Sequence, residues 1–192
     1  MESLLVSTGV VALAEIGDKT QLLAFILAAR FRRPVPIIAG ILCATLFNHC
    51  MAGALGAWIV ATLSPPILRW VLGISFLGMA MWTLIPDKIE EEEDAMASRY
   101  GVFGATLVSF FLAEMGDKTQ LATVAMAAHF GTPVLVVIGT TLGMLIADVP
   151  AVFLGRGLAE RIPMKLVHSI AAAMFAAMGV ATLLGLGSGL GF

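Results

Sequence analysis

A ten-residue sequence that occurs twice constrains the fold of this chain more than any other feature. Residues 13–22 read LAEIGDKTQL and residues 112–121 read LAEMGDKTQL, so nine of the ten positions are identical after a shift of 99 residues. The same shift, without a gap, also pairs residues well beyond the motif, among them Phe31 with Phe130, Pro34 with Pro133, Gly40 with Gly139, Phe76 with Phe175 and Thr83 with Thr182. The chain is therefore predicted to be a tandem duplication.

The composition places the duplicated sequence in a membrane. The 192 residues are 59% hydrophobic and 12% charged, whereas soluble domains carry about 25% charged residues. A net charge of −2 without a basic block argues against nucleic-acid binding. A membrane-spanning helix needs roughly 20 mostly apolar residues. Six ranges meet that requirement: 4–29, 34–62, 66–86, 102–128, 133–155 and 164–187.

Three of these ranges lie in each half of the chain. Because three is an odd number, the second half would enter the membrane from the opposite side, as in the inverted repeats of many secondary transporters. The predicted fold class is an all-α polytopic membrane protein of six transmembrane helices, built as two inverted three-helix repeats. The first repeat covers 1–86, an acidic cytoplasmic linker covers 87–100, and the second repeat covers 101–192. Lysine and arginine concentrate in the loops after the first, third and fifth helices, which predicts that both termini lie outside.

The repeated motif places charged side chains in the middle of two apolar ranges. Glu15 and Glu114 each lie about a dozen residues into a predicted helix, near the centre of the bilayer. A charged side chain there costs roughly 2.5–3.5 kcal/mol, and six of them would cost on the order of 15–20 kcal/mol if they were unpaired. The charged residues of the two motifs are therefore expected to face one another or water: Glu15, Asp18, Lys19, Glu114, Asp117 and Lys118.

Four carboxylates that converge near the midplane would form a site for a hard cation. Oxygen ligands without Cys or Met at the motif spacing suit Ca²⁺, Mn²⁺ or Mg²⁺. Four carboxylates and two ammonium groups sum to −2, which one divalent cation or two protons would neutralise. This balance leads to the hypothesis that one cation exchanges for two protons. The predicted metal ligands are Glu15, Asp18, Glu114 and Asp117.

Two questions about the motif stay open at the level of sequence. Glu15 and Lys19 are spaced four residues apart, as are their counterparts, and could form salt bridges that only orient helix packing. In a regular helix Thr20 lies nearly opposite Glu15, so either the helix unwinds at Gly17 or Thr20 bonds to its own backbone. Possible auxiliary groups of the site are Lys19, Thr20, Gln21, Lys118, Thr119, Gln120, Asp148 and Asn48.

Polar residues also interrupt the second and fifth helices. Asp148, with a proline two residues later, is expected to mark a break that lines the same cavity, and Asn48 occupies the corresponding stretch of the second helix. His49 is the repeat counterpart of Asp148, and a packed, hydrogen-bonded histidine is favoured there over a ligand. Cys43 and Cys50 lack the spacing of a zinc or redox motif and are expected to be buried thiols.

The duplicated motif resembles that of one family of transporters. The pattern E-x-G-D-(K/R)-(T/S), matched in full by Glu15–Thr20 and Glu114–Thr119, is similar to that of the cation/proton exchanger family named for human transmembrane protein 165, whose bacterial members include manganese exporters. The resemblance covers essentially the whole chain. It implies export of Ca²⁺ or Mn²⁺ against protons, with the glutamates and aspartates of both motifs as binding carboxylates, in a compact bacterial member of the family.

These observations predict a secondary transporter rather than an enzyme. The expected activity is export of a divalent cation, Mn²⁺ in preference to Ca²⁺, in exchange for protons. A passive divalent-cation channel and a membrane-embedded lipid-phosphate hydrolase are the alternatives, although no arginine lies in either motif. No permanently bound cofactor is expected. The expected partners are the metal ion, protons, the lipid bilayer and, in a homo-oligomer, further copies of the chain. The expected location is a bacterial inner membrane.

Overall fold

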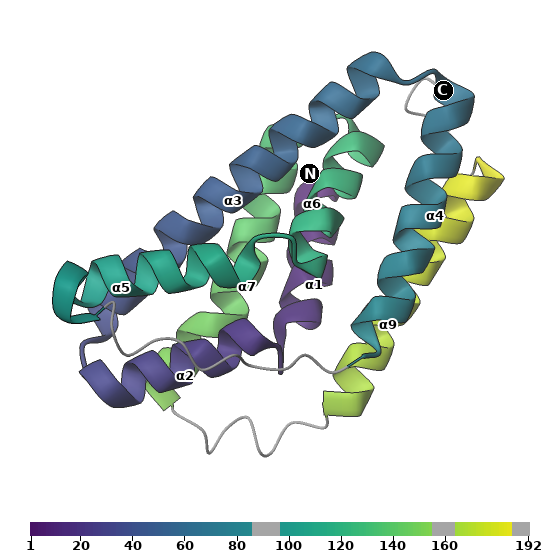
Figure 1. Cartoon of the computed structure of the whole chain (residues 1–192). Coiled ribbons are helices and arrows are strands. Elements are labelled where there is room, and N and C mark those ends of the chain that lie inside the picture. Colours follow the sequence, from purple (N-terminus) through teal and green to yellow (C-terminus); the bar gives the residue numbers. More distant parts are fainter. Residues whose placement is uncertain (86–96, 155–163, 186–192) are drawn as a thin grey trace.

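The chain folds into helices throughout the part that the structure describes. This structure is a computed structural model that describes residues 1–85, 97–154 and 164–185, so most of the predicted linker at 87–100 lies outside the described residues. The predicted all-α class is confirmed for the described ranges (Figure 1). The helices are α1 (Glu2–Glu15), α2 (Lys19–Phe31), α3 (Pro34–Thr62), α4 (Pro65–Thr83), α5 (Ala97–Glu114), α6 (Lys118–Phe130), α7 (Pro133–Leu154) and α9 (Met164–Leu184).

The helix bounds follow the predicted ranges, except that two of the ranges are divided. The range 34–62 coincides with α3, whereas 4–29 corresponds to both α1 and α2, and 102–128 corresponds to both α5 and α6, the first of which begins five residues earlier, at Ala97. Each division falls inside the repeated motif. Among the described residues, four helical segments are long and apolar enough to cross a membrane, namely Pro34–Thr62, Pro65–Thr83, Pro133–Phe153 and Lys165–Leu184.

Local sequence explains where several helices begin and end. Pro34, Pro65 and Pro133 stand at the first position of α3, α4 and α7, where the N–H groups have no helical partner and a missing donor costs little. α2 and α6 end at residues with left-handed backbone, Arg32 with φ 51° and Gly131 with φ 61°. In both halves, this left-handed residue and the proline that follows turn the chain sharply into the next helix.

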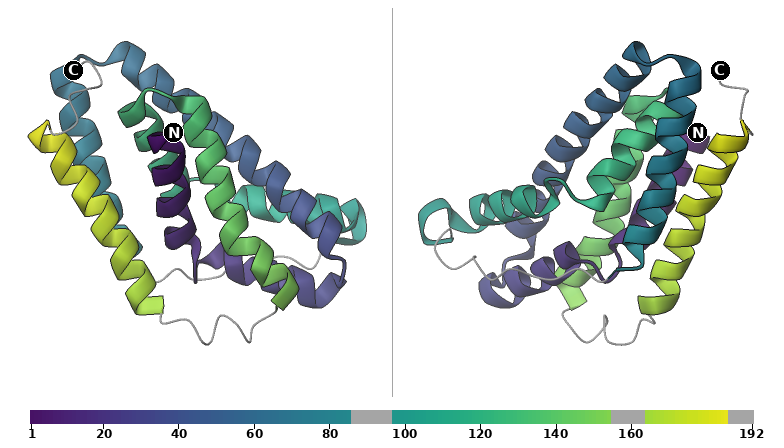
Figure 2. Two further views of the ribbon diagram at one scale, coloured as in Figure 1. Left: turned by 180° about the vertical axis from the view of Figure 1, so that it is seen from behind. Right: turned by 45° about the vertical axis from the view of Figure 1, so that its right-hand side comes forward.

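The helix contacts of the two halves correspond to each other. α1 packs against α7 as α5 packs against α3, and α2 packs against α7 as α6 packs against α3 (Figures 1 and 2). Glycines allow the close approach: a Cβ on Gly40 of α3 would clash with Thr106 of α5, and a Cβ on Gly139 of α7 would clash with Ser7 of α1. These two contacts are related by the same shift of 99 residues.

α4 and α9 form a pair that packs on only part of the remaining helices. They cross closely at Gly73 and Gly179, where added Cβ atoms would clash with Leu183 and Leu77. α9 also contacts α1, and α4 contacts α6, but neither has comparable packing on α2 or α5 in the described part of the chain. The figures show the pair beside α1 and α6 and away from α2 and α5. The packing of this pair is therefore one-sided.

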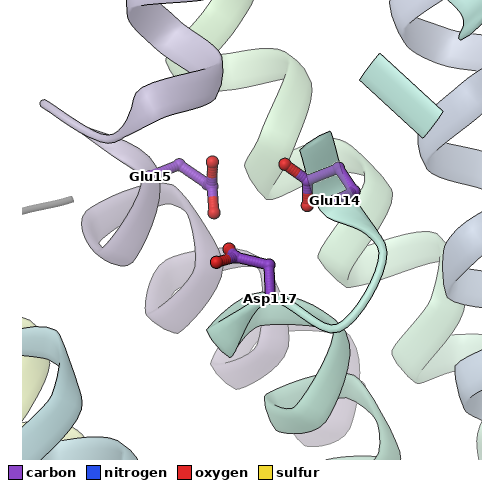
Figure 3. A group of neighbouring side chains, drawn as sticks. All are labelled: Glu15, Glu114 and Asp117. Atoms are coloured by element: carbon purple, nitrogen blue, oxygen red, sulfur yellow. The ribbon is translucent and has the colours of Figure 1, made fainter. Parts of the chain in front are cut away.

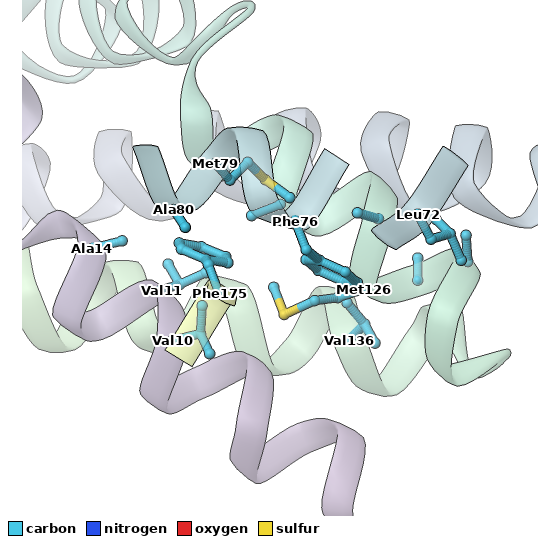
Figure 4. Close-up of a cluster of buried hydrophobic side chains, with 14 of the residues drawn as sticks. Val10, Val11, Ala14, Leu72, Phe76, Met79, Ala80, Met126, Val136 and Phe175 are labelled. Carbon is cyan, nitrogen blue, oxygen red and sulfur yellow. The ribbon is translucent and has the colours of Figure 1, made fainter. Parts of the chain in front are cut away.

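Two hydrophobic cores lie on either side of the divided motifs. The first is built from α1, α4, α6, α7 and α9, with Phe76, Met126 and Phe175 at its centre (Figure 4). The second is built from α2, α3, α5 and α7 around Ile41 and Phe110. Because lipid is as apolar as these side chains, close packing rather than removal from water stabilises such cores. α1 and α2 belong to different cores, and so do α6 and α5, so each break lies between the cores.

The expectation that Cys43 and Cys50 are buried is wrong. Both are free thiols exposed on the surface of α3, beside apolar side chains that are also exposed, such as Phe47 and Met51. Residues seven positions apart share one face of a helix. In a membrane protein that outer face contacts lipid, so an apolar residue needs no place in the protein interior.

Candidate functional site

Both repeated motifs interrupt a helix at their glycine. Gly17 has φ 85° and Gly116 has φ 79°, in the left-handed region that residues with a Cβ rarely adopt. Asp18 and Asp117 follow with extended backbone, at ψ 172° and 166°, and stand at the N-caps of α2 and α6. Of the two alternatives for Thr20, local unwinding at the glycine is therefore confirmed.

The glutamines of the motifs hold the breaks in shape. The N–H of Gly17 donates to Oε1 of Gln21 at 2.9 Å, and the N–H of Gly116 donates to Oε1 of Gln120 at 2.7 Å. Nε2 of Gln21 also donates to the carbonyl oxygen of Ala147 in α7, at 3.0 Å. The side-chain oxygens of Gln21 and Gln120 thus accept hydrogen bonds from the backbone of the breaks.

The threonines reach the glutamates because the helix is broken. Oγ1 of Thr20 donates to Oε2 of Glu15 at 2.6 Å, and Oγ1 of Thr119 donates to Oε2 of Glu114 at 3.0 Å. Thr119 Oγ1 also lies 3.4 Å from Oδ2 of Asp117. All of these side chains are buried. The hydroxyl groups therefore orient the carboxylates of the two glutamates.

The lysines pair with aspartates of the opposite half. Nζ of Lys19 lies 3.1 Å from Oδ1 of Asp117, and Nζ of Lys118 lies 2.7 Å from Oδ1 of Asp18. The side chain of Lys19 is 26% exposed, whereas those of the other three residues are at most 2% exposed. Each pair brings opposite charges together in an apolar surrounding and joins the two breaks to each other.

The two glutamates and one aspartate form a compact acidic cluster. One carboxylate oxygen each from Glu15, Glu114 and Asp117 lies within 4.8 Å of the others, and all three residues are buried. Figure 3 shows the three carboxylates turned toward one another. Glu15 and Glu114 form no ion pair with described residues, and Oε1 of each has no hydrogen-bond partner among them. The interpretation of the motif as a Glu15–Lys19 salt bridge within one helix is therefore wrong.

The predicted residues outside the motifs are fully buried but differ in their contacts. Nδ2 of Asn48 donates to the carbonyl oxygen of Phe111 in α5 at 3.2 Å, so this residue connects α3 to α5. His49 lies inside the protein with Nδ1 3.5 Å from Oγ1 of Thr141. Neither oxygen of Asp148 has a hydrogen-bond partner in the described part of the chain.

One contact of the breaks was not predicted. Nε2 of His168 in α9 lies 3.0 Å from the carbonyl oxygen of Ile16, and because a carbonyl can only accept, the ring nitrogen donates. α9 is thereby bonded to the break between α1 and α2. The only sequence signal was a histidine within an apolar range, which more often reflects packing than a functional contact.

Comparisons with known proteins agree with this arrangement of the chain. The family model described as divalent cation/proton antiporter GDT1 matches residues 3–91 and 102–188. A Vibrio cholerae serotype O1 protein, whose name proposes it as a manganese exporter, is 50% identical over 183 residues, covering 95% of this chain and 90% of that protein. GDT1-like protein 3 of Oryza sativa subsp. indica is 26% identical over 207 residues, covering 94% and 73%. GDT1-like protein sll0615 of Synechocystis sp. is 29% identical over 184 residues, covering 86% and 88%. No solved structure matches the chain.

Proposed function

The chain belongs to the GDT1 family of divalent cation/proton antiporters, and from that premise we propose that it exports Mn²⁺ in exchange for protons. The resemblance predicted from the duplicated motif is confirmed at the level of this family, which is a family of transporters. The proposal has three parts: the transported cation, the residues that bind it, and the number of protons exchanged for it.

The acidic cluster carries the proposal for the site. Glu15, Glu114 and Asp117 converge within 4.8 Å in the interior, at a place where three carboxylates without a cation would repel one another strongly. Asp18 is the fourth proposed carboxylate, and its Oδ1 faces Lys118 at 2.7 Å. A divalent cation bound among these oxygens would remove the repulsion.

Mn²⁺ is the favoured cargo and Ca²⁺ the alternative. Carboxylate and hydroxyl oxygens are the groups present around the cluster, and such ligands suit hard divalent cations. The name of the Vibrio cholerae relative, half of whose aligned residues are identical, points to manganese. Both ions are transported substrates in this proposal, and neither is a resident cofactor.

The charges of the site support an exchange of one cation for two protons. Asp18 with Lys118 and Asp117 with Lys19 form two neutral pairs. Glu15 and Glu114 then carry the remaining charge of −2 of the two motifs. One Mn²⁺ or two protons would neutralise the glutamates. In either case the site would be neutral while its access changes from one side of the membrane to the other.

We propose six membrane spans in two inverted repeats, as the sequence predicts. α1 with α2, and α5 with α6, would each form one broken span. α1 has 14 residues and α2 has 13, and α2 turns away from the direction of α1 at the break (Figure 1), so the proposed span would be bent near its middle. The excess of positive residues in the loops supports an orientation with both termini outside, and the proposed membrane is a bacterial inner membrane. The breaks would then lie near the midplane.

Metal-dependent proton flux in liposomes tests the proposal. Purified protein is reconstituted, Mn²⁺, Ca²⁺ or Mg²⁺ is supplied on one side, and metal uptake and internal pH are recorded together. We expect Mn²⁺ flux coupled to the counter-movement of two protons, driven uphill by an imposed pH gradient. Asp117→Asn should lower this flux at least tenfold.

Each part of the proposal can fail separately in this experiment. Metal flux that runs only downhill and moves no protons would identify a passive channel. Release of phosphate from a lipid-phosphate substrate would identify a hydrolase. Full coupled flux in the Asp117→Asn variant would refute the assignment of the site while leaving antiport intact.

A further inference from the structure

Asp148 of α7 is a buried carboxylate to which the proposed exchange gives no role. It is 0% exposed, and neither of its oxygens has a hydrogen-bond partner among the described residues. Asp18 and Asp117, in contrast, each lie beside the ammonium group of a lysine. An ionised carboxylate buried without a partner is strongly unfavourable. Asp148 is therefore placed where it gains from a bound cation.

Contacts of α7 hold the backbone beside Asp148 against the helices of the first break. α7 packs against both α1 and α2, the helices on either side of the first break. Gln21 donates to the carbonyl oxygen of Ala147 at 3.0 Å, so the residue preceding Asp148 is held against the start of α2. The charge of Asp148 also acts on both Glu15 and Glu114. Its carboxylate thus contributes to the same electrostatic environment as the cluster.

We propose that Asp148 is a further ligand of the transported divalent cation, in addition to Glu15, Glu114 and Asp117. The inference rests on the proposed function and deepens it by naming a residue outside the repeated motif. Mn²⁺ and Ca²⁺ take six or more oxygen ligands, so the three carboxylates of the cluster leave coordination positions open. A carboxylate from α7 adds an oxygen ligand, and its negative charge raises the number of protons that neutralise the metal-free site from two to three, of which one stays on the site when Mn²⁺ replaces the other two.

The proposed ligand set is asymmetric between the two halves. The counterpart of Asp148 in the first half is His49, which supplies neither a negative charge nor a carboxylate oxygen. Asp18 also lies outside the cluster that includes its counterpart Asp117. The second half therefore supplies Glu114, Asp117 and Asp148, whereas the first half supplies Glu15 and, outside the cluster, Asp18. The proposed ligands are therefore distributed unequally between the two repeats, although the motif itself occurs in both.

Two measurements on the full chain test this assignment. The first is the KM for Mn²⁺ of coupled flux in liposomes, and the second is the unfolding temperature in detergent with and without Mn²⁺. The test variant is Asp148→Asn, which keeps the shape and removes the charge. The control is Thr140→Val, which removes another buried polar group from α7, one whose hydroxyl donates to the carbonyl of Val137 in its own helix at 3.2 Å.

We expect Asp148→Asn to raise the KM for Mn²⁺ at least tenfold and to remove most of the Mn²⁺-dependent rise in unfolding temperature, since a ligand stabilises only the state that binds it. The unfolding temperature without metal should stay the same or rise, because an unpaired buried charge has been removed. Thr140→Val should keep both the KM and the Mn²⁺-dependent rise. Asp148→Glu, which retains a carboxylate, should keep part of the rise.

The outcomes distinguish this inference from the proposed function. If the wild type neither exchanges Mn²⁺ nor gains stability from it, the proposed function fails. If the wild type does both, Glu15→Gln loses both, and Asp148→Asn keeps the wild-type KM and rise, only the role of Asp148 is refuted. A lower unfolding temperature of Asp148→Asn and Asp148→Ser without metal, at unchanged KM, would show a structural role and overturn the assignment.

Discussion

Nζ of Lys118 lies 2.7 Å from Oδ1 of Asp18, and each side chain is only 1% exposed. The two residues are far apart in the sequence, so this ion pair joins the start of α6 to the break before α2. Its counterpart, Lys19 with Asp117, is longer at 3.1 Å and has a lysine that is 26% exposed. The two ion pairs cross between the halves of the chain but are buried to different depths.

The difference in burial predicts unequal effects of removing the two lysines. Lys118→Met leaves the carboxylate of Asp18 buried without its lysine, and breaking a buried ion pair costs about 3–5 kcal/mol. Lys19→Met should cost less, because a partly exposed ion pair is screened and contributes less. Thermal unfolding of both variants in the same detergent at neutral pH measures the order. If Lys19→Met lowered the unfolding temperature as much as Lys118→Met or more, the Lys118–Asp18 pair would not be the one that stabilises the fold more.

The threonines that donate to the glutamates predict a hydroxyl requirement at two positions. Thr20→Val removes a donor that lies 2.6 Å from an oxygen of Glu15, and Thr119→Val removes one that lies 3.0 Å from an oxygen of Glu114. A hydrogen bond to a charged group contributes about 1.5–3 kcal/mol, so the affinity for Mn²⁺ should fall roughly tenfold or more in each variant. Thr20→Ser and Thr119→Ser retain the hydroxyl and should stay close to wild type. Equal affinities of the Val and Ser variants in a Mn²⁺ titration would exclude this role.

The identity of the charged residues could be predicted from the sequence, whereas their pairing could not. The shift of 99 residues identifies Glu15, Asp18 and Lys19 together with their counterparts without any knowledge of the fold. Prolines and apolar runs similarly predict the ends of α3 and α7 to within a residue. These are local signals. The partner of Lys19, however, is decided by the crossing of the two halves, which brings Asp117 within 3.1 Å.

Helical periodicity failed at the motif because the helix is not continuous there. Counting at 100° per residue places Thr20 opposite Glu15, but the left-handed Gly17 changes the chain direction and lets Thr20 donate to Glu15. The isolation of Asp148 could not be predicted either, since it depends on how α7 packs against α1 and α2. In both cases the tertiary arrangement decides the contact.

The conformation of the second break predicts which substitutions Gly116 tolerates. Its φ is 79°, and an added Cβ would meet nothing within 4 Å, so backbone strain rather than space limits the substitution. A left-handed residue with a Cβ costs about 1–2 kcal/mol, and Asn tolerates this conformation better than most residues. Gly116→Asn should therefore keep most Mn²⁺ flux, and Gly116→Val should lose stability and flux. Indistinguishable Asn and Val variants would show that the break does not need this backbone conformation.

Close packing of α3 against α6 predicts opposite effects for two helical glycines. A Cβ on Gly56 would lie 2.5 Å from the carbonyl oxygen of Val124 and 2.8 Å from Cβ of Ala127, whereas a Cβ on Gly78 would meet nothing within 4 Å. Gly56→Ala should cost about 1–3 kcal/mol as an overpacked substitution. Gly78→Ala should be neutral or stabilise by up to about 1 kcal/mol through helix propensity. Unfolding temperatures in detergent test the pair, and a destabilised Gly78→Ala with an unaffected Gly56→Ala would contradict the observed contacts.

The one-sided packing of α4 and α9 predicts from which side water reaches the site. α9 packs on α1 and α4 packs on α6, and neither packs comparably on α2 or α5 in the described residues. Met115, next to the second break, is 51% exposed, whereas its counterpart Ile16 has its carbonyl bonded to His168 of α9. In a background with Cys43→Ser and Cys50→Ser, Met115→Cys should therefore react faster with a membrane-impermeant thiol reagent than Ile16→Cys. It should react only from the side of the α2–α3 connection, which we propose is cytoplasmic. Faster reaction of Ile16→Cys, or reaction of Met115→Cys from the side of the N-terminus, would show that the site opens in the other direction.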